Sequence, residues 1–263
     1  MREKLIALSM VKNGNWQEIY QFLRQDKNLD AIDESLAKKL IANLGEVKTV
    51  TILDDFYPES WREMSRPPFV LYLRGNTALL GENKLGLIGG KTLTGYTKRQ
   101  LDFLIQQLPE ETVVVTGFEQ GVEAYGSTAK HEKIVCVATG FNHLDIYEKL
   151  PTFQQLTDSD LLISEIPPKG TFNMKAYYRN YHFINELSHV LAIYQMPTFD
   201  LRMKYLTYLT EMGKPVYVLP DRIDETTAGG LSLLNHGAKC LLKVGELVEE
   251  ITDASHEVEG EQG

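Results

Sequence analysis

Two stretches between residues 84 and 140 repeat one pattern, in which a short apolar run ends in small residues. Residues 85–88 run into Gly89-Gly90, and residues 113–115 run into Thr116-Gly117. A continuous apolar run of this length is typical of a parallel strand covered on both faces, and helices between such strands form βαβ units. The pattern therefore predicts an α/β fold: a Rossmann-like, mostly parallel sheet with helices on both faces.

The glycines that end these runs mark the edge where chemistry is expected. At the carboxyl ends of parallel strands, backbone N–H groups approach an anion closely, and the next helix N-terminus adds partial positive charge. Neither Gly89-Gly90-Lys91 nor Thr116-Gly117 matches a P-loop or a dinucleotide-binding fingerprint. The alternative, that the glycines only form tight turns between strand and helix, stays open.

Charge is distributed unevenly along the 263 residues. The formal net charge is −9, but seven acids and no Lys or Arg lie in residues 246–263, and removing these acids leaves −2 for residues 1–245. A local basic face is therefore compatible with the composition. We expect residues 246–263 to form a disordered acidic tail. Since no apolar run reaches the length of a membrane span, we expect a cytoplasmic protein without a membrane partner.

Metal and redox chemistry have little support. The two cysteines, Cys136 and Cys240, lie in or beside apolar runs and read as buried thiols, and the six histidines lack metal-ligand spacing. We predict no metal, no cofactor and no disulfide framework.

Residues 1–48 read as a small helical module of the helix-hairpin type. Asn15 is placed to cap one helix, Asp33-Glu34-Ser35 opens a second, and apolar residues follow at helical spacing in both. The module lacks a basic cluster, which favours a packing or partner role over DNA binding. The predicted domains are thus the module 1–48, the Rossmann-like domain 49–245 and the tail 246–263.

A basic and aromatic segment lies between residues 166 and 185, which contain no acid. It carries the following cations and rings: Lys169, Phe172, Lys175, Tyr177, Tyr178, Arg179, Tyr181 and Phe183. Cations that contact phosphates and rings that stack on unpaired bases suit sequence-tolerant binding of single strands. The alternative is that the rings face the core at the start of a helix that ends at Leu187.

Several short motifs follow one another between Val50 and Leu242. They are Tyr57-Pro58, Pro67-Pro68, Gly75-Asn76, Gly89-Gly90-Lys91 with Thr94, residues 116–123, Ser164-Glu165 with Gly170, Arg179-Asn180, and Leu233-Leu234 with Gly237-Ala238. Their order and spacing resemble the DprA/Smf family of DNA-processing proteins. The chain departs from the family pattern at Lys91 and Tyr181, where arginines are usual, and at Asp200, where a serine-glycine-serine stretch is usual.

The resemblance implies a single-stranded DNA-binding protein that protects incoming DNA and loads the RecA recombinase during natural transformation. It also implies a homodimer through the C-terminal half. Carried over by position, the DNA contacts are Gly89, Gly90, Lys91, Thr94, Lys175, Arg179 and Asn180. Lysine lacks the two-point grip of arginine, so Lys91 implies weaker phosphate binding.

No catalytic triad or paired-carboxylate arrangement is evident in the sequence, and we expect that the protein is not an enzyme. The main alternative is a Rossmann-like protein that binds or hydrolyses small nucleotides with Glu123 or Glu165, both of which follow expected strands. A further alternative is a scaffold paralogue that has lost DNA binding.

Overall fold

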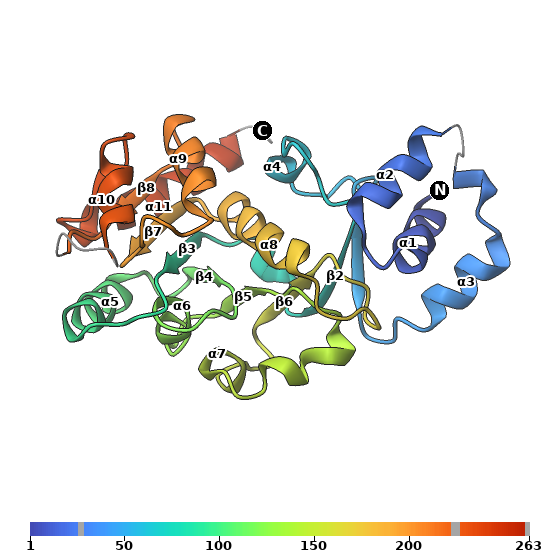
Figure 1. Cartoon of the computed structure of the whole chain (residues 1–263), viewed down its shortest axis with the longest axis horizontal. Helices are drawn as coiled ribbons and strands as arrows, with labels where there is room; N and C mark the ends of the chain where they lie inside the picture. Colours follow the sequence, from blue (N-terminus) through green and yellow to red (C-terminus); the bar gives the residue numbers. More distant parts are fainter. Residues whose placement is uncertain (26–28, 222–226, 261–263) are drawn as a thin grey trace. The chain divides into compact units, whose positions relative to one another are not determined.

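A computed structural model describes residues 1–25, 29–221 and 227–260 (Figure 1). The chain divides into two compact units. The first unit consists of Met1–Thr77, Cys136–Ile146 and Leu161–Phe183, and the second of Ala78–Val135, Tyr147–Asp160 and Ile184–Gly263. None of the described helices combines the length and the apolar character that a membrane span requires.

The first unit opens with helices α1 (Arg2–Val11), α2 (Trp16–Arg24) and α3 (Glu34–Ala42). The predicted cap at Asn15 is confirmed, since its side chain accepts a hydrogen bond from the first turn of α2. The predicted second helix starts where expected, and the side chain of Asp33 caps it. A 3-10 turn, η1 (Leu29–Ala31), precedes α3. These helices share the unit with three strands, so the unit extends beyond the predicted module 1–48.

The sheet of the first unit is antiparallel. It contains β1 (Lys48–Thr51), β2 (Val70–Gly75) and β6 (Leu161–Ser164), with β2 between the other two. The connection from β1 to β2 holds the short helix α4 (Glu59–Arg62). Its buried residue Trp61 and the hydrogen bond from Tyr57 Oη to Pro68 O, 2.9 Å long, fix the predicted tyrosine-proline turn.

The sheet of the second unit is parallel throughout, as the sequence predicts. Along the chain, its strands are β3 (Lys84–Gly89), β4 (Val113–Thr116), β5 (Lys133–Cys136), β7 (Val190–Tyr194), β8 (Val216–Val218) and β9 (Lys239–Cys240). In the sheet they lie in the order β5-β4-β3-β7-β8-β9. The last residue of β5 belongs to the first unit. The glycine turns after β3 and β4 follow two neighbouring strands at one edge of this sheet.

Helices surround this sheet. They are α5 (Gly95–Gln107), α6 (Val122–Gly126), α7 (Pro151–Gln154), α9 (Met203–Glu211), α10 (Ala228–Leu234) and the end of α8 (Met174–Leu187), which begins in the first unit. Leu85 and Leu87 pack in one core with Leu101 and Leu104 of α5. Ile88, which points to the opposite face of β3, is also fully buried. Both faces of the strand are therefore covered. Two short 3-10 segments, η2 (Thr77–Gly81) and η3 (Phe141–Tyr147), follow β2 and β5.

The expectation of a disordered tail from residue 246 is wrong for most of that segment. Helix α11 (Val244–Gly260) covers it, and Leu247 and Ile251 are fully buried in the core that holds Leu85. Val244, Leu247, Val248 and Ile251 repeat at helical spacing and form an apolar stripe that the acid count of the segment conceals. Residues 261–263 of the predicted tail lie outside the described residues.

Candidate nucleic-acid interface

The turn after β3 brings Gly90 against the backbone of β7. The Gly90 N–H donates to Tyr194 O at 3.1 Å, and a Cβ at Gly90 would lie 2.1 Å from Gln195 O. Only glycine fits this close approach of two backbones. The tight-turn alternative therefore accounts for Gly90 by itself, and the role of this residue in anion binding stays a prediction.

Thr94 caps helix α5 directly after this turn. Its hydroxyl accepts a hydrogen bond from Thr97 N–H at 3.1 Å, and its own N–H donates to Gln195 Oε1 at 3.1 Å. The N-terminus of α5 thus follows the Gly89-Gly90 turn by a few residues and contributes partial positive charge near it.

Lys91 is the exposed cation of the turn, and an acid from the next loop contacts it. Its Nζ lies 2.9 Å from a carboxylate oxygen of Glu119, in the loop between β4 and α6. The Lys91 side chain is 69% exposed, whereas that of Glu119 is only 14% exposed. The carboxylate is therefore the fixed member of the pair.

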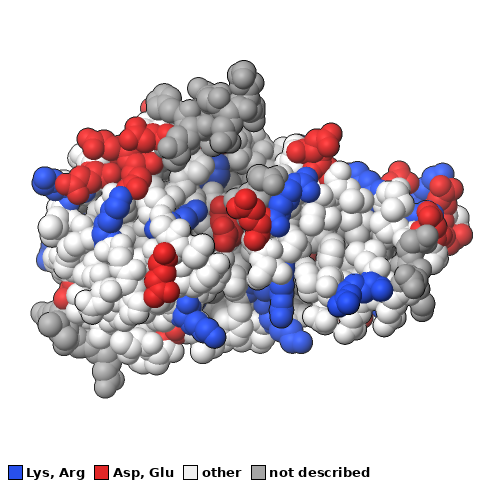
Figure 2. All heavy atoms as spheres, turned by 90° about the horizontal axis from the view of Figure 1, so that it is seen from above, with Lys and Arg blue, Asp and Glu red and all other residues white. Residues whose placement is uncertain are grey.

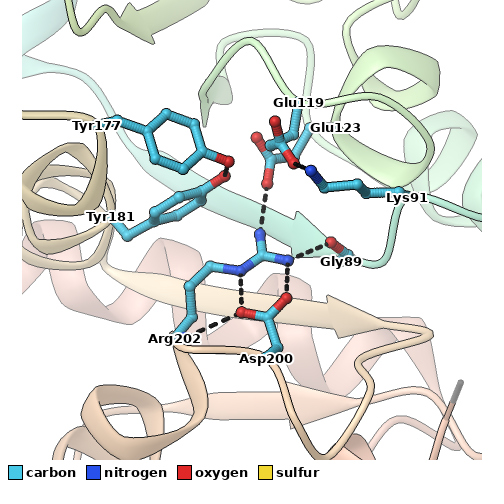
Figure 3. A network of polar contacts seen from close by, with 8 residues as sticks. All are labelled: Gly89, Lys91, Glu119, Glu123, Tyr177, Tyr181, Asp200 and Arg202. Carbon is cyan, nitrogen blue, oxygen red and sulfur yellow. Dashed lines mark hydrogen bonds and ion pairs between the residues drawn. The ribbon is translucent and has the colours of Figure 1, made fainter. Parts of the chain in front are cut away.

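A buried ionic network lies beside the turn (Figure 3). The Arg202 guanidinium donates to Glu123 Oε1 at 2.9 Å, to both carboxylate oxygens of Asp200 at 2.7 and 2.8 Å, and to Gly89 O at 2.8 Å. Arg202 and Glu123 are both buried. One side chain thus ties together the end of β3, helix α6 and the loop before α9.

The two acids of this network respond differently to their surroundings. Burial raises the pKa of Glu123 to about 7, against the opposing charge of Arg202. Burial also acts to raise the pKa of Asp200, but its hydrogen bonds to Arg202 and the arginine charge outweigh burial and lower it. Asp200 thus stays ionised at neutral pH, whereas Glu123 gains or loses its proton near pH 7.

Replacing Glu123 by glutamine is expected to flatten the pH dependence of stability. Since the pKa of Glu123 is about 7 in the folded state and 4.5 ordinarily, the folded state alone holds the proton between these values. The stability that Glu123 contributes is complete below 4.5 and is lost as pH rises to about 7. Urea unfolding of the wild type and Glu123→Gln across this range measures the difference; parallel profiles would contradict the assignment.

The first unit holds the other predicted contacts, and two of them are engaged with the protein. The Arg179 guanidinium donates to both carboxylate oxygens of Glu165, at 2.6 and 2.5 Å, and to Arg66 O at 3.2 Å. Asn180 is buried, and its amide donates to Cys136 O at 3.1 Å. For Arg179 to contact a phosphate, its guanidinium would have to share Glu165 or leave it.

The basic and aromatic segment separates into buried and exposed rings. Tyr181 and Phe183 are buried, as the core-facing alternative predicts, whereas Phe172 and Tyr178 are 41% and 39% exposed. Ring contacts join Tyr177 to Phe172, Tyr178 and Tyr181. Two rings thus stay accessible, and the partly buried Tyr177 supports both of them and rests in turn on the buried Tyr181.

Lys169 and Lys175 lie in the same part of the first unit and are both exposed. The Lys169 carbonyl accepts from His143, and the Lys175 N–H donates to the Asn173 side chain, so the backbone is held at both positions. The contacts of the described residues include no ion pair for either ammonium group. This segment therefore offers cations and ring faces together.

The seven predicted contacts fall into two sets. Gly89, Gly90, Lys91 and Thr94 lie together in the second unit, and Lys175, Arg179 and Asn180 lie together on α8 in the first. The sequence did not indicate Arg202 or Glu119. The burial of Arg202 depends on residues that are distant in the sequence, such as Glu123 and Gly89.

The carboxylates of the hydrolase alternative are not placed to act on a ligand. Glu123 and Glu165 are both buried, and each is paired with an arginine of its own unit. The described residues contain no group of three His, Cys, Asp or Glu side chains that could hold a metal ion. The burial of both carboxylates and their pairing with arginines disfavour the hydrolase alternative.

The parallel sheet of the second unit, with its glycine turn at the carboxyl edge, defines a Rossmann-like α/β protein. The family model of the DNA recombination-mediator protein A matches residues 48–252, which is most of the chain. The chain belongs to this family and has a role in DNA processing. The DprA/Smf resemblance is thereby confirmed.

Two bacterial relatives are named DNA processing protein DprA. The Bacillus subtilis (strain 168) protein is 25% identical over 214 residues, which cover 79% of this chain and 72% of the relative. The Streptococcus pneumoniae (strain ATCC BAA-255 / R6) protein is 25% identical over 215 residues, which cover 76% and 73%. The likeness thus extends over about three quarters of each chain.

Two solved structures share the fold. The S. pneumoniae DprA structure matches with a TM-score of 0.73 at 18% identity, covering 96% of this chain and 93% of that one. The Helicobacter pylori protein, described as having a unique single-stranded DNA binding mode, matches with a TM-score of 0.68 at 22% identity, covering 80% and 97%. These likenesses confirm the Rossmann-like fold.

Proposed function

We propose that this protein binds single-stranded DNA, protects incoming DNA and loads the RecA recombinase during natural transformation, without catalysing a reaction of its own. The observation that carries the proposal is the exposure of Phe172 and Tyr178 beside Lys169 and Lys175. Membership of a DNA-processing family and the DNA binding described for the H. pylori relative support it. We place this activity in the cytoplasm, where RecA acts.

The chemistry of this segment favours single strands over duplex. Ring faces stack on bases that are unpaired, and duplex bases are stacked on one another instead. Lysines contact phosphates without reading sequence, so binding should be salt-dependent and tolerant of sequence. On the face shown in Figure 2, the described basic side chains are spread among acidic ones. On this face a short local site is therefore better supported than a long basic groove.

The test is fluorescence anisotropy of a labelled poly-dT oligonucleotide at about 50 and 200 mM salt, with duplex of equal length as competitor. Binding that falls with salt and resists duplex competition is the expected result. No binding at the lower salt concentration would favour the small-nucleotide or scaffold alternatives, which thermal stabilisation by a nucleoside monophosphate would then distinguish.

Handover to the recombinase has a direct assay. RecA hydrolyses ATP when it assembles on single-stranded DNA, and a coat of single-strand-binding protein slows that assembly. We expect this chain to restore the rate on coated DNA. An unchanged rate would contradict the loading role while leaving DNA binding intact.

We also propose a homodimer through the C-terminal half. Four large apolar side chains are exposed in or beside α9, namely Phe199, Leu201, Tyr208 and Met212. Exposed apolar groups that gather on one element are typical of protein interfaces. They lie in the part of the chain to which the family resemblance assigns self-association.

The double variant Leu201→Glu/Met212→Glu is expected to be a monomer where the wild type is a dimer, because burying two carboxylates would oppose association. Sedimentation velocity at micromolar concentration measures the change, and Phe103→Glu, on the exposed side of α5, is the matched control. A wild type that sediments as a monomer would rule out the dimer.

A further inference from the structure

The ion pair between Lys91 and Glu119 places a carboxylate on the exposed cation of the glycine turn. The two groups lie 2.9 Å apart, within the second unit. A carboxylate and a phosphate compete for the same ammonium donors, since both offer anionic oxygens. Glu119 therefore occupies a contact that a DNA phosphate would use.

The loop that carries Glu119 is fixed on the turn by its backbone. Val122 N–H donates to Gly90 O at 3.1 Å, and a Cβ at Gly121 would lie 2.3 Å from the same oxygen. Gly121 also has a φ of 80°, a backbone conformation that residues other than glycine rarely adopt. The loop thus needs glycine to lie this close to the turn.

Ring contacts hold the other end of the loop. Phe118, next to Glu119, stacks on Tyr147 with ring centres 4.3 Å apart and also contacts Phe153. With Phe118 and Gly121 both anchored, the Glu119 carboxylate has little freedom to withdraw. Lys91 has more freedom, because most of its side chain is exposed.

The neighbouring cation, Arg202, does not compensate the negative charge of Glu119. Arg202 already donates to Glu123, Asp200 and Gly89 O, and its side chain is buried. Asp200 is held ionised by Arg202. An incoming phosphate at this turn therefore meets a lysine that is already paired and acids that are fixed in place.

We propose that Glu119 competes with DNA phosphate for Lys91 and so limits the affinity of the glycine turn for single strands. The inference rests on the proposed DNA-binding function. It adds to that function a residue that determines affinity, and it predicts that an acid can be removed with a gain in binding. Lys91 alone should then matter little in the wild type, because its charge is already neutralised.

The test is the anisotropy assay with poly-dT at low salt on Glu119→Gln, Lys91→Gln and the double variant. An ion pair of this exposure limits the effect to about fivefold, so Glu119→Gln is expected to bind about three- to fivefold more tightly. The gain should shrink at higher salt, which screens exposed pairs. It should be absent when Lys91 is also replaced. Lys91→Gln alone should weaken binding by less than about twofold.

Glu111→Gln is the matched control, because it removes the same charge from an exposed position before β4 in the same unit. Equal gains from Glu111→Gln and Glu119→Gln would reveal a general charge effect and overturn the inference. A wild type that binds while Glu119→Gln binds no more tightly would overturn it too, and the proposed function would stand. If neither the wild type nor Glu119→Gln binds DNA, the inference and the proposed function both fail.

Discussion

Replacing Arg202 by alanine is expected to lower the free energy of unfolding by about 3–5 kcal/mol. The substitution leaves Glu123 buried without a charged partner and removes the hydrogen bond to Gly89 O. The full desolvation penalty then applies to a carboxylate whose pKa burial already raises to about 7. Urea unfolding followed by circular dichroism measures this loss of stability. Circular dichroism is preferred to tryptophan fluorescence, because both tryptophans lie in the first unit and Arg202 lies in the second.

Two further variants separate charge from geometry at this position. Arg202→Lys keeps the charge but not the planar fork that donates to three residues, so an intermediate loss of stability is expected. Arg202→Met combined with Glu123→Gln leaves no unpaired charge in the buried part of the network and should be more stable than Arg202→Ala. An Arg202→Ala protein within about 1 kcal/mol of the wild type would show that the network contributes little.

The double variant Phe172→Ala/Tyr178→Ala is expected to lose about thirtyfold or more in affinity for poly-dT. Stacking on an aromatic ring contributes about 1–3 kcal/mol per base, and two rings at the lower end of that range account for such a loss. Because both rings are substantially exposed, stability should change by only about 1 kcal/mol. Anisotropy and thermal unfolding of the same preparations measure the two effects.

Phe103→Ala is the matched control for this variant, since Phe103 is an exposed ring on α5 in the other unit. Its affinity should equal that of the wild type. Equal affinities for the wild type and the double variant would favour the core-facing alternative, in which the rings of the segment support the core and its lysines are only solvated.

Local patterns predicted much of the fold because the determining residues are neighbours in sequence. The cap at Asn15, the helix start at Asp33 and the apolar runs of β3 and β4 are each recognised within a few residues. Helix α1 was not predicted. Five consecutive residues of it are buried, so no helical period distinguishes a buried face from a solvated one.

The candidate site was less predictable because its electrostatics depend on long-range contacts. Arg179 and Lys91 read as cations available for phosphate, and the structure pairs them with Glu165 and Glu119. Composition likewise predicted stacking for all the rings of the basic and aromatic segment, yet burial leaves only some of them accessible. Exposure and pairing are properties of the folded chain, and a single sequence carries no direct record of them.

The segmented make-up of the first unit has a consequence for synthesis on the ribosome. Its third strand, β6, begins at Leu161, after the strands β3, β4 and β5 have been made. Until then β2 has no partner strand on one side, and its buried residues Tyr72 and Leu73 lack the β6 residues Ser164 and Ile163 opposite them. While the nascent chain is being translated, one edge of β2 therefore stays unpaired. An unpaired strand edge promotes aggregation, so we expect chaperone binding early in synthesis to favour correct folding.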